Sequence, residues 1–246
     1  TRLKTFADNQ FYGRFLELPA DVVGYNRYFG WYKDAGSAEN FGEWLDLYHN
    51  EKEKRPVCLS EYGGGGAISQ HKDNVNWESD IDPVGVRHYE NYQSQLHEIL
   101  WKQFSVRKYL WAEFIWCMFD FASYGRTEGD TKSQNDKGLC TRERIPKDVY
   151  FFYKSVWSGE KTVYITERRH EFRACDVPFV KVYSNADAVE LCINDVSHGR
   201  ISRCELPDDE STVFVWENIK IKPGTKNKIC AKAYFSDGTS RTDYAF

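Results

Sequence analysis

Residues 55–66 read RPVCLSEYGGGG, an apolar run that ends in the carboxylate of Glu61 and is followed by four glycines. Such a run is typical of a strand buried on both faces of a parallel sheet. In barrels of βα units, catalytic groups project from the carboxyl ends of strands, and glycines beyond them let the backbone approach a ligand. Glu61 is therefore a candidate catalytic carboxylate, and a helix cap or a partner of an arginine is the alternative. The run lacks the Lys-Ser/Thr ending of a phosphate loop, so a nucleotide site is not indicated.

Around this run, residues 1–160 alternate short apolar stretches with helical ones, which predicts βα units on a parallel sheet. The expected strands are Leu3–Ala7, Val22–Tyr28, Val57–Glu61 and Tyr109–Met118. The first helix should begin near Ser37 or Asn40 and end before Pro56, because Pro cannot continue a helix. A second should follow Pro83, with an apolar stripe from Val86 to Gln103, and a third should start at Pro146.

Residues 161–246 lose the helical period and read as short strands separated by turn residues. We therefore expect a second domain here, a β-sandwich of immunoglobulin type, beside a first domain of residues 1–160. The expected strands are Thr162–Thr166, Phe179–Tyr183, Ala188–Ile193, Val213–Ile221 and Lys228–Phe235. The expected turns are Asn194-Asp195, Pro223-Gly224 and Asp237-Gly238.

The composition limits the function. The 33 basic and 37 acidic residues give a net charge of -4, so we expect no nucleic-acid partner. No apolar run is long enough for a membrane span. Aromatic residues make up 16 % of the chain, which favours a carbohydrate ligand because flat rings stack on sugars. The cysteines form no CxxC pair, and the sequence indicates neither a metal site nor a cofactor.

Two further clusters lie at the ends of expected strands. Residues 26–32 read NRYFGWY and mix amide, guanidinium and phenol groups with aromatic rings, as sugar sites do. Tyr28 could donate a hydrogen bond to a neighbouring carboxylate, and ordinary aromatic packing at a barrel mouth is the alternative. Trp116 lies near the end of the last expected strand and is either the floor of a sugar site or part of the core.

Several motifs together resemble glycoside hydrolase family 2, and within it bacterial β-galactosidases. They are residues 60–71 (SEYGGGGAISQH), 116–123 (WCMFDFAS) and 135–139 (NDKGL), with further similarity at residues 146–154 and 163–166. The resemblance covers almost the whole chain and weakens only in the C-terminal sandwich. It implies a (β/α)8 TIM barrel and a retaining mechanism.

The resemblance also implies roles for single residues. Glu61 matches the nucleophile at the end of the seventh barrel strand, and Tyr28 matches the tyrosine that hydrogen-bonds it. Asn26 and Trp116 match sugar-binding positions. Asn135 and Lys137 match a pair that grips the substrate carboxylate in the family's glucuronidases and occurs in galactosidases too. Cys117 stands where an asparagine is expected beside the tryptophan.

The expected function is a β-galactosidase that cleaves terminal β-D-galactosides with retention. A β-glucuronidase of the same family and a non-catalytic carbohydrate-binding or structural module are the alternatives.

Retaining hydrolysis needs two carboxylates about 5 to 5.5 Å apart, of which one protonates the leaving group. The family takes this acid/base from an Asn-Glu pair, and the pair in this chain, Asn50-Glu51, falls on the polar tail of an expected helix. A whole barrel takes about 250 residues, so we expect residues 1–160 to form only its C-terminal half, inactive or very weak alone. The expected partners are a β-linked galactoside or related glycan, and either the upstream half of the enzyme or a second copy. The bacterial cytoplasm and periplasm both stay open as the compartment.

Overall fold

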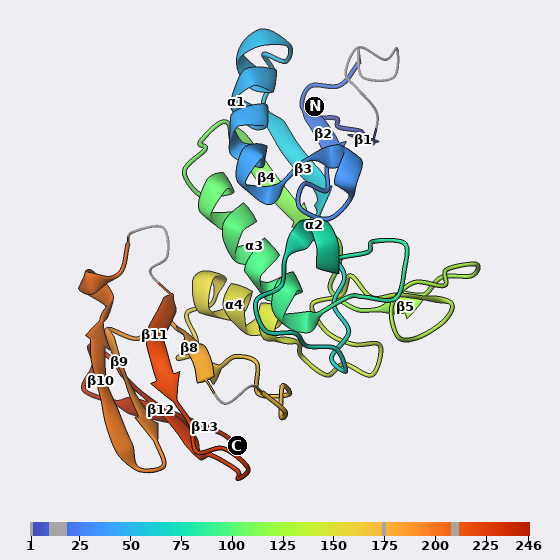
Figure 1. Ribbon diagram of the computed structural model, residues 1–246. Coiled ribbons are helices and arrows are strands. Elements are labelled where there is room, and N and C mark those ends of the chain that lie inside the picture. Colours follow the sequence, from blue (N-terminus) through green and yellow to red (C-terminus); the bar gives the residue numbers. More distant parts are fainter. Residues whose placement is uncertain (1, 10–18, 174–175, 208–211) are drawn as a thin grey trace. The chain divides into compact units, whose positions relative to one another are not determined.

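In the computed structural model of the chain (Figure 1), residues 2–9, 19–173, 176–207 and 212–246 are described. They form two compact units. We call Thr1–Ala67 with Val75–Ile145 the α/β unit, and Ile68–Asn74 with Pro146–Phe246 the β-rich unit. The expected domain boundary between residues 160 and 161 stays a prediction. Among the described residues, no helix combines the length and the apolar character that crossing a membrane requires.

The α/β unit contains a parallel sheet in the order β1-β2-β3-β4. Its strands are β1 (Ala7–Asp8), β2 (Val23–Asn26), β3 (Val57–Tyr62) and β4 (Leu110–Ile115). The last three confirm expected strands, whereas β1 begins where the strand expected at Leu3–Ala7 ends. A short antiparallel pair, β5 (Phe121–Ala122) and β6 (Gln134–Asn135), follows the sheet.

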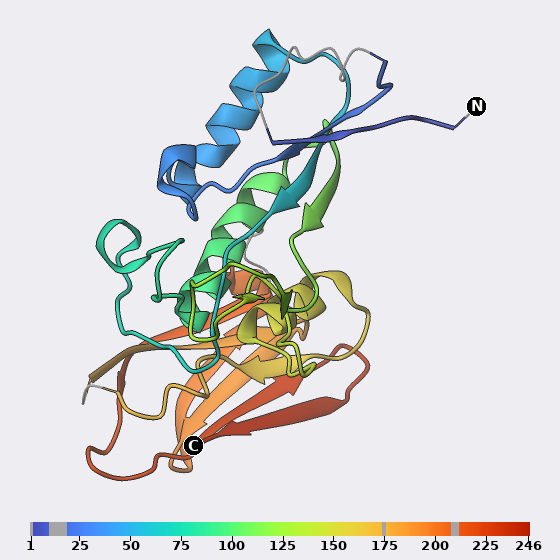
Figure 2. The same cartoon turned by 90° about the vertical axis from the view of Figure 1, so that its right-hand side faces the viewer.

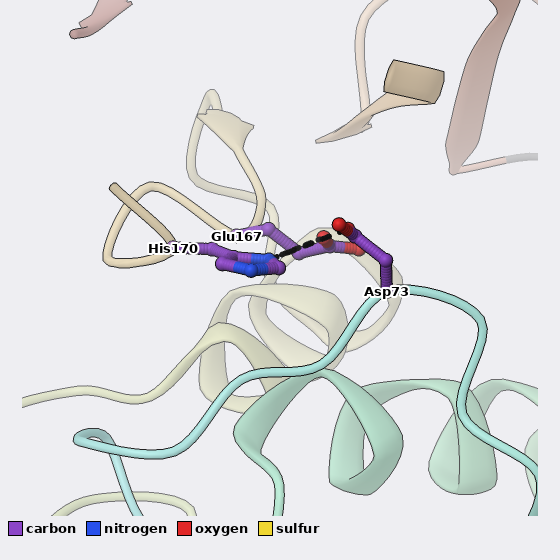
Figure 3. A group of neighbouring side chains, drawn as sticks. All are labelled: Asp73, Glu167 and His170. Atoms are coloured by element: carbon purple, nitrogen blue, oxygen red, sulfur yellow. Dashed lines mark ion pairs between the residues drawn. The ribbon is translucent and has the colours of Figure 1, made fainter. Parts of the chain in front are cut away.

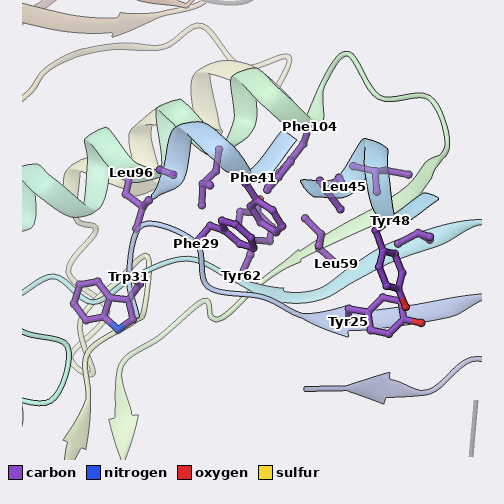
Figure 4. Close-up of a cluster of buried hydrophobic side chains, with 14 of the residues drawn as sticks. Tyr25, Phe29, Trp31, Phe41, Leu45, Tyr48, Leu59, Tyr62, Leu96 and Phe104 are labelled. Atoms are coloured by element: carbon purple, nitrogen blue, oxygen red, sulfur yellow. The ribbon is translucent and has the colours of Figure 1, made fainter. Parts of the chain in front are cut away.

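Two helices, α1 (Phe41–Glu51) and α3 (Glu90–Phe104), cover the same face of this sheet (Figures 2 and 4). Each helix buries an apolar stripe because its large side chains recur every three or four residues. In α3 the stripe is Tyr92, Leu96, Leu100 and Phe104. In α1, Phe41 stacks on Phe29 with 4.3 Å between the ring centroids. The sheet and both helices thus share one aromatic-rich core. A short helix, α2 (Trp77–Asp80), and the 3₁₀ turns Lys33–Ala35 and Ala38–Asn40 complete the unit.

The start of α3 corrects the sequence-based expectation. The helix begins at Glu90, and Val86, expected on its buried stripe, is 63 % exposed. The buried ring of His88 holds the preceding segment in a non-helical path, since its Nε2 lies 3.1 Å from the carbonyl oxygen of Asp82 and its Nδ1 contacts Asp136. Tertiary contacts therefore override the apolar spacing at residues 83–89.

The β-rich unit begins with α4 (Asp148–Trp157) and continues as two antiparallel sheets around a common apolar core. One sheet has the order β10-β9-β12-β13 and the other β11-β8-β7 (Figure 1). The strands are β7 (Val163–Ile165), β8 (Asp176–Ser184), β9 (Ala188–Ile193), β10 (Val196–Ser202), β11 (Val213–Lys220), β12 (Ile229–Tyr234) and β13 (Ser240–Ala245), with a 3₁₀ turn at Arg203–Glu205.

The turn between β9 and β10 confirms one sequence signal. Asn194 and Asp195 both have positive φ, as a two-residue hairpin requires. By contrast, β10 and β13 were not among the expected strands. They are the two edge strands of their sheet and expose most of their side chains, so neither carries an apolar pattern.

Candidate active site

The α/β unit brings Glu61 and Asn26 together at the carboxyl ends of two neighbouring strands. Asn26 is the last residue of β2 and is the register partner of Glu61 near the end of β3. The Ser60 hydroxyl donates to the Asn26 side-chain oxygen at 2.8 Å. Parallel strands end at the same edge of their sheet, which is where ligands bind in folds of this class. The position predicted for Glu61 is therefore one from which a catalytic group can reach a ligand.

A hydrogen bond joins Tyr28 to Glu61. The phenol oxygen of Tyr28 donates to Oε2 of Glu61 at 2.7 Å. Burial and this hydrogen bond raise the pKa of Tyr28 above its usual value, so its hydroxyl keeps its proton and remains a donor. A charge-assisted hydrogen bond of this length orients the carboxylate.

The alternative roles considered for Glu61 are not observed. The N-cap of α2 is Asn76, whose side chain accepts from two backbone amides, and the N-cap of α3 is Tyr89. Among the residues that the structure describes, Glu61 forms no ion pair with an arginine.

The four glycines after Glu61 pack against the protein itself, where we had expected them to admit a ligand. A Cβ atom on Gly64 would lie 2.7 Å from both Leu96 and Trp31. A Cβ on Gly65 would lie 2.9 Å from Nδ1 of His88, and Gly63 has φ of +127°, a conformation that favours glycine. The run is therefore needed for close internal packing beneath the strand ends.

The loop that carries Asn135 and Lys137 is tied to this edge of the sheet through its backbone. The amide of Gly66 donates to the carbonyl oxygen of Asp136 at 3.1 Å. The amide of Cys117, the residue after Trp116, donates to the carbonyl oxygen of Lys137 at 3.0 Å. Trp116 itself donates from its amide to the end of β3, and its ring meets Phe121 edge-on. Trp116 is partly exposed, so its ring is only in part a core residue.

Lys137 places a buried ammonium beside Tyr28. The residue is only 2 % exposed, and its Nζ lies 5.9, 5.5 and 5.4 Å from the ring centroids of Tyr28, Trp31 and Tyr32. Such distances are typical of cation–π contacts. Asn135 fixes the turn, because its side-chain oxygen accepts from the Lys137 amide at 3.0 Å. Within the described ranges, Nζ of Lys137 has no carboxylate partner.

The sequence did not reveal the buried pair that supports this loop. Nδ1 of His88 lies 2.7 Å from Oδ2 of Asp136, and both side chains are buried. The side-chain amide of Gln93 donates to the carbonyl oxygens of Gly64 and Gly138. His88 and Asp136 are 48 positions apart in the chain, so no local spacing signals their contact.

A second group of ionisable side chains lies in the β-rich unit. Asp73, Glu167 and His170 place one ligand atom each within 4.8 Å of one another. The sequence indicated no metal site, because the segments that carry these residues are about ninety positions apart.

Two family models and a curated relative match this chain. Residues 1–162 match the family described as "Glycosyl hydrolases family 2, TIM barrel domain", and residues 177–241 match a "Domain of unknown function (DUF4982)". A β-glucuronidase of Bacteroides fragilis is 35 % identical over 226 residues, which are 91 % of this chain and 31 % of that protein.

Two solved structures resemble this chain over nearly its whole length. A "putative beta-galactosidase" of Bacteroides fragilis has a TM-score of 0.88 and 28 % identity, covering 99 % of this chain and 35 % of the other. An FMN-binding β-glucuronidase from Facaelibacterium prausnitzii L2-6 has a TM-score of 0.83 and 32 % identity, covering 100 % and 35 %. The chain thus spans about a third of the length of these relatives. Since the family match extends over 162 of the 246 residues and contains the motifs at residues 60–71, 116–123 and 135–139, the chain belongs to glycoside hydrolase family 2.

Proposed function

We propose that this chain supplies the nucleophile side of a retaining glycoside hydrolase site, with Glu61 as the nucleophile. The observation that carries the proposal is the 2.7 Å hydrogen bond from Tyr28 to Glu61 at the carboxyl end of β3. A nucleophilic carboxylate must be held at a fixed angle to the anomeric carbon, and a donor on one of its oxygens does this. Asn26 and Trp116, which flank the same strand ends, would contact the sugar.

In the proposed reaction, a carboxylate oxygen of Glu61 attacks the anomeric carbon and the glycosidic bond breaks. The leaving oxygen takes a proton from an acid, and water then hydrolyses the glycosyl–enzyme ester with that same acid acting as base. Tyr28 donates to Glu61 throughout, because its raised pKa keeps its proton in place.

The acid/base would come from residues outside this chain. Glu51, in the chain's Asn-Glu pair, is the exposed last residue of α1, which leads into the amino end of β3, whereas Glu61 lies near the carboxyl end of that strand. We therefore propose that the α/β unit is the C-terminal half of a (β/α)8 barrel, and that an immunoglobulin-like sandwich follows it.

Lys137 favours an acidic sugar. Its ammonium is buried, is surrounded by aromatic faces and has no carboxylate partner among the described residues. A buried charge without a counter-ion is costly unless a ligand supplies one. The carboxylate of a β-linked uronic acid is such a ligand, so a β-glucuronidase is the first candidate.

A β-galactosidase is the second candidate. It is supported by the resemblance of residues 60–71 and 116–123 and by the structural likeness to the galactosidase named above. A neutral galactoside would leave Lys137 in contact only with the aromatic rings. The two candidates therefore differ in the role that they give to this ammonium.

The test is covalent trapping of the nucleophile. The chain is incubated with 2-deoxy-2-fluoro-β-glucuronyl fluoride or the matching galactosyl fluoride, because fluoride leaves with little help from an acid. Intact-mass and peptide mass spectrometry should find one glucuronyl adduct on Glu61, absent from Glu61→Gln. Folded protein that forms neither adduct would contradict the proposed site.

Variants of the loop separate the two sugars. Lys137→Met should slow glucuronyl trapping by about 10- to 100-fold, the effect of a lost hydrogen bond to a charged group, and leave galactosyl trapping unchanged. Lys132→Met, at an exposed lysine of the same loop, is the matched control. Galactosyl trapping that exceeds glucuronyl trapping and is insensitive to Lys137 would favour the galactosidase.

The sheet edges suggest the macromolecular partner. The described sheet ends at β4, which exposes 43 % of Trp111 and 51 % of Phe114. Unpaired strands with exposed aromatic residues pair readily with another chain or segment. We propose the upstream half of the same enzyme as the occupant, with a second copy as the other outcome. In sedimentation velocity, a well-folded monomer of this chain alone would count against the second copy, and failure to form a complex with the added upstream half would count against the first.

A further inference from the structure

Three side chains from distant parts of the sequence meet inside the β-rich unit (Figure 3). Asp73 comes from the segment Ile68–Asn74, and Glu167 and His170 come from the turn that follows β7. Nδ1 of His170 lies 3.6 Å from Oδ1 of Asp73 and 3.9 Å from Oε2 of Glu167. One imidazole nitrogen thus faces two carboxylate oxygens without touching either.

The nitrogen of His170 that points into this group is unsatisfied. Its side chain is 10 % exposed, and within the described part of the chain Nδ1 has no hydrogen-bond partner. A buried polar atom without a partner destabilises the folded state, and both carboxylates lie beyond hydrogen-bond distance. A small cation between the three groups would satisfy all of them at once.

The neighbouring contacts hold the group in place. The ring of His71 stacks on that of His170, with 5.4 Å between the centroids and 17° between the planes. The amide of His170 donates to the carbonyl oxygen of Glu167 at 3.0 Å, which closes the turn. The amide of Glu167 in turn donates to the buried carboxylate of Asp148. The imidazole and the Glu167 backbone are therefore already oriented.

Glu167 is able to serve as an anionic ligand. Nη2 of Arg173 forms an ion pair with Oε2 of Glu167 at 3.1 Å and donates to the Glu167 carbonyl oxygen at 3.0 Å. A carboxylate offers about four lone-pair sites on its two oxygens, so this ion pair leaves room for a metal bond.

We propose that Asp73, Glu167 and His170 bind one divalent transition-metal ion, for which Zn²⁺ is the best fit. Zinc takes imidazole nitrogen and carboxylate oxygen at about 2.0 to 2.2 Å, so two ligands of a tetrahedral ion lie roughly 3.3 to 3.5 Å apart. The observed 3.6 and 3.9 Å from Nδ1 of His170 require side-chain movements of only a few tenths of an ångström, and the two carboxylates, which lie within 4.8 Å of each other, must also approach. Ca²⁺ prefers six to eight oxygen ligands and Mg²⁺ an octahedral shell of them, which this group does not supply.

The fourth zinc ligand would be water. Glu167 and His170 line a cavity of about 780 Å³ inside the same unit, which is large enough to admit an ion and its remaining water. Two carboxylates and a neutral imidazole balance the charge of a divalent ion. Three protein ligands and one open position define a site at which water or a small anion can exchange.

Metal titration tests the proposal. The chain is stripped with a chelating resin and titrated with ZnCl₂ in competition with a chromogenic chelator, and one saturable site per chain is expected. His170→Gln, Asp73→Asn and Glu167→Gln should each weaken binding by at least about tenfold. His198→Gln and Glu171→Gln are the matched controls, because both residues are exposed and outside the group. CaCl₂ and MgCl₂ at equal concentration should not compete.

A spectroscopic readout on the unaltered chain covers the case in which a variant fails to fold. In ¹⁵N-edited NMR of the histidine side chains, stoichiometric Zn²⁺ should shift the Nδ1 resonance of His170. The proposal is wrong if Nδ1 of His170 is unchanged by Zn²⁺, or if folded His170→Gln binds Zn²⁺ as tightly as the unaltered chain. Either result would mean that His170 is not a metal ligand.

Discussion

Replacing Gly65 with alanine tests whether the glycine run is required for packing beneath the strand ends. The added Cβ would lie 2.9 Å from Nδ1 of His88 and 3.0 Å from the Trp31 ring, and would press on the Asp136 carboxylate. All three side chains are buried, and His88 and Asp136 hold each other at 2.7 Å. None can yield without breaking a contact, so we expect a loss of about 1 to 3 kcal/mol, as for other overpacked sites.

Thermal and urea unfolding measure this loss. About 2 kcal/mol corresponds to a fall in Tm of roughly 4 to 8 °C for a chain of this size. Gly159→Ala is the control, because no heavy atom lies within 4 Å of the added Cβ, and it should change stability by less than about 0.5 kcal/mol. If the two variants melt together, the packing explanation of the glycine run is refuted.

Three further substitutions test separate contacts. Tyr28→Phe removes the donor to the proposed nucleophile and should slow trapping by the fluorinated sugar about 10- to 100-fold, with an unchanged rate as the contrary result. Tyr164→Phe removes the buried 2.7 Å hydrogen bond to Asp148 and should lower the free energy of unfolding in urea by about 1.5 to 3 kcal/mol. A loss below about 0.5 kcal/mol would show that the bond contributes little. Hydrogen bonds from Arg107 lower the pKa of Asp46, so its stabilisation is present above the ordinary pKa of about 3.9 and disappears as pH falls through the lower folded value. In urea unfolding, the free energy of unfolding should therefore fall less between pH 7 and pH 3 for Asp46→Asn than for the unaltered chain. A larger fall for the variant would contradict this prediction.

The elements that were predictable are those whose side chains are buried in a regular pattern. Val57–Tyr62 was recognisable because a central parallel strand is apolar on both faces, and α1 because its buried residues recur at helical spacing. The edge strands β10 and β13 bury few side chains and left no such pattern. The start of α3 was placed too early, since only the tertiary contacts of His88 reveal that residues 83–89 leave the helical path.

The same distinction applies to the candidate site. Strand-end positions point to Glu61 from the sequence alone, and the family resemblance assigned Tyr28 and Lys137. The contact between the Lys137 ammonium and the Trp31 ring could not be predicted, because Trp31 lies on a loop more than a hundred positions earlier in the chain. The Asp73, Glu167 and His170 group left no signal for the same reason.

Asp136, the residue between Asn135 and Lys137, has a partner that the structure reveals and the sequence alone does not. In the sequence, Asp136 could be read as the counter-ion of the adjacent lysine. In the structure, its carboxylate turns to His88 at 2.7 Å, while Lys137 turns to the aromatic rings near Tyr28. The chain therefore engages its own carboxylate elsewhere and keeps the ammonium free of it. Since a buried ammonium is stable only with a compensating group, this division of charge is the physical reason to test an acidic sugar before a neutral one.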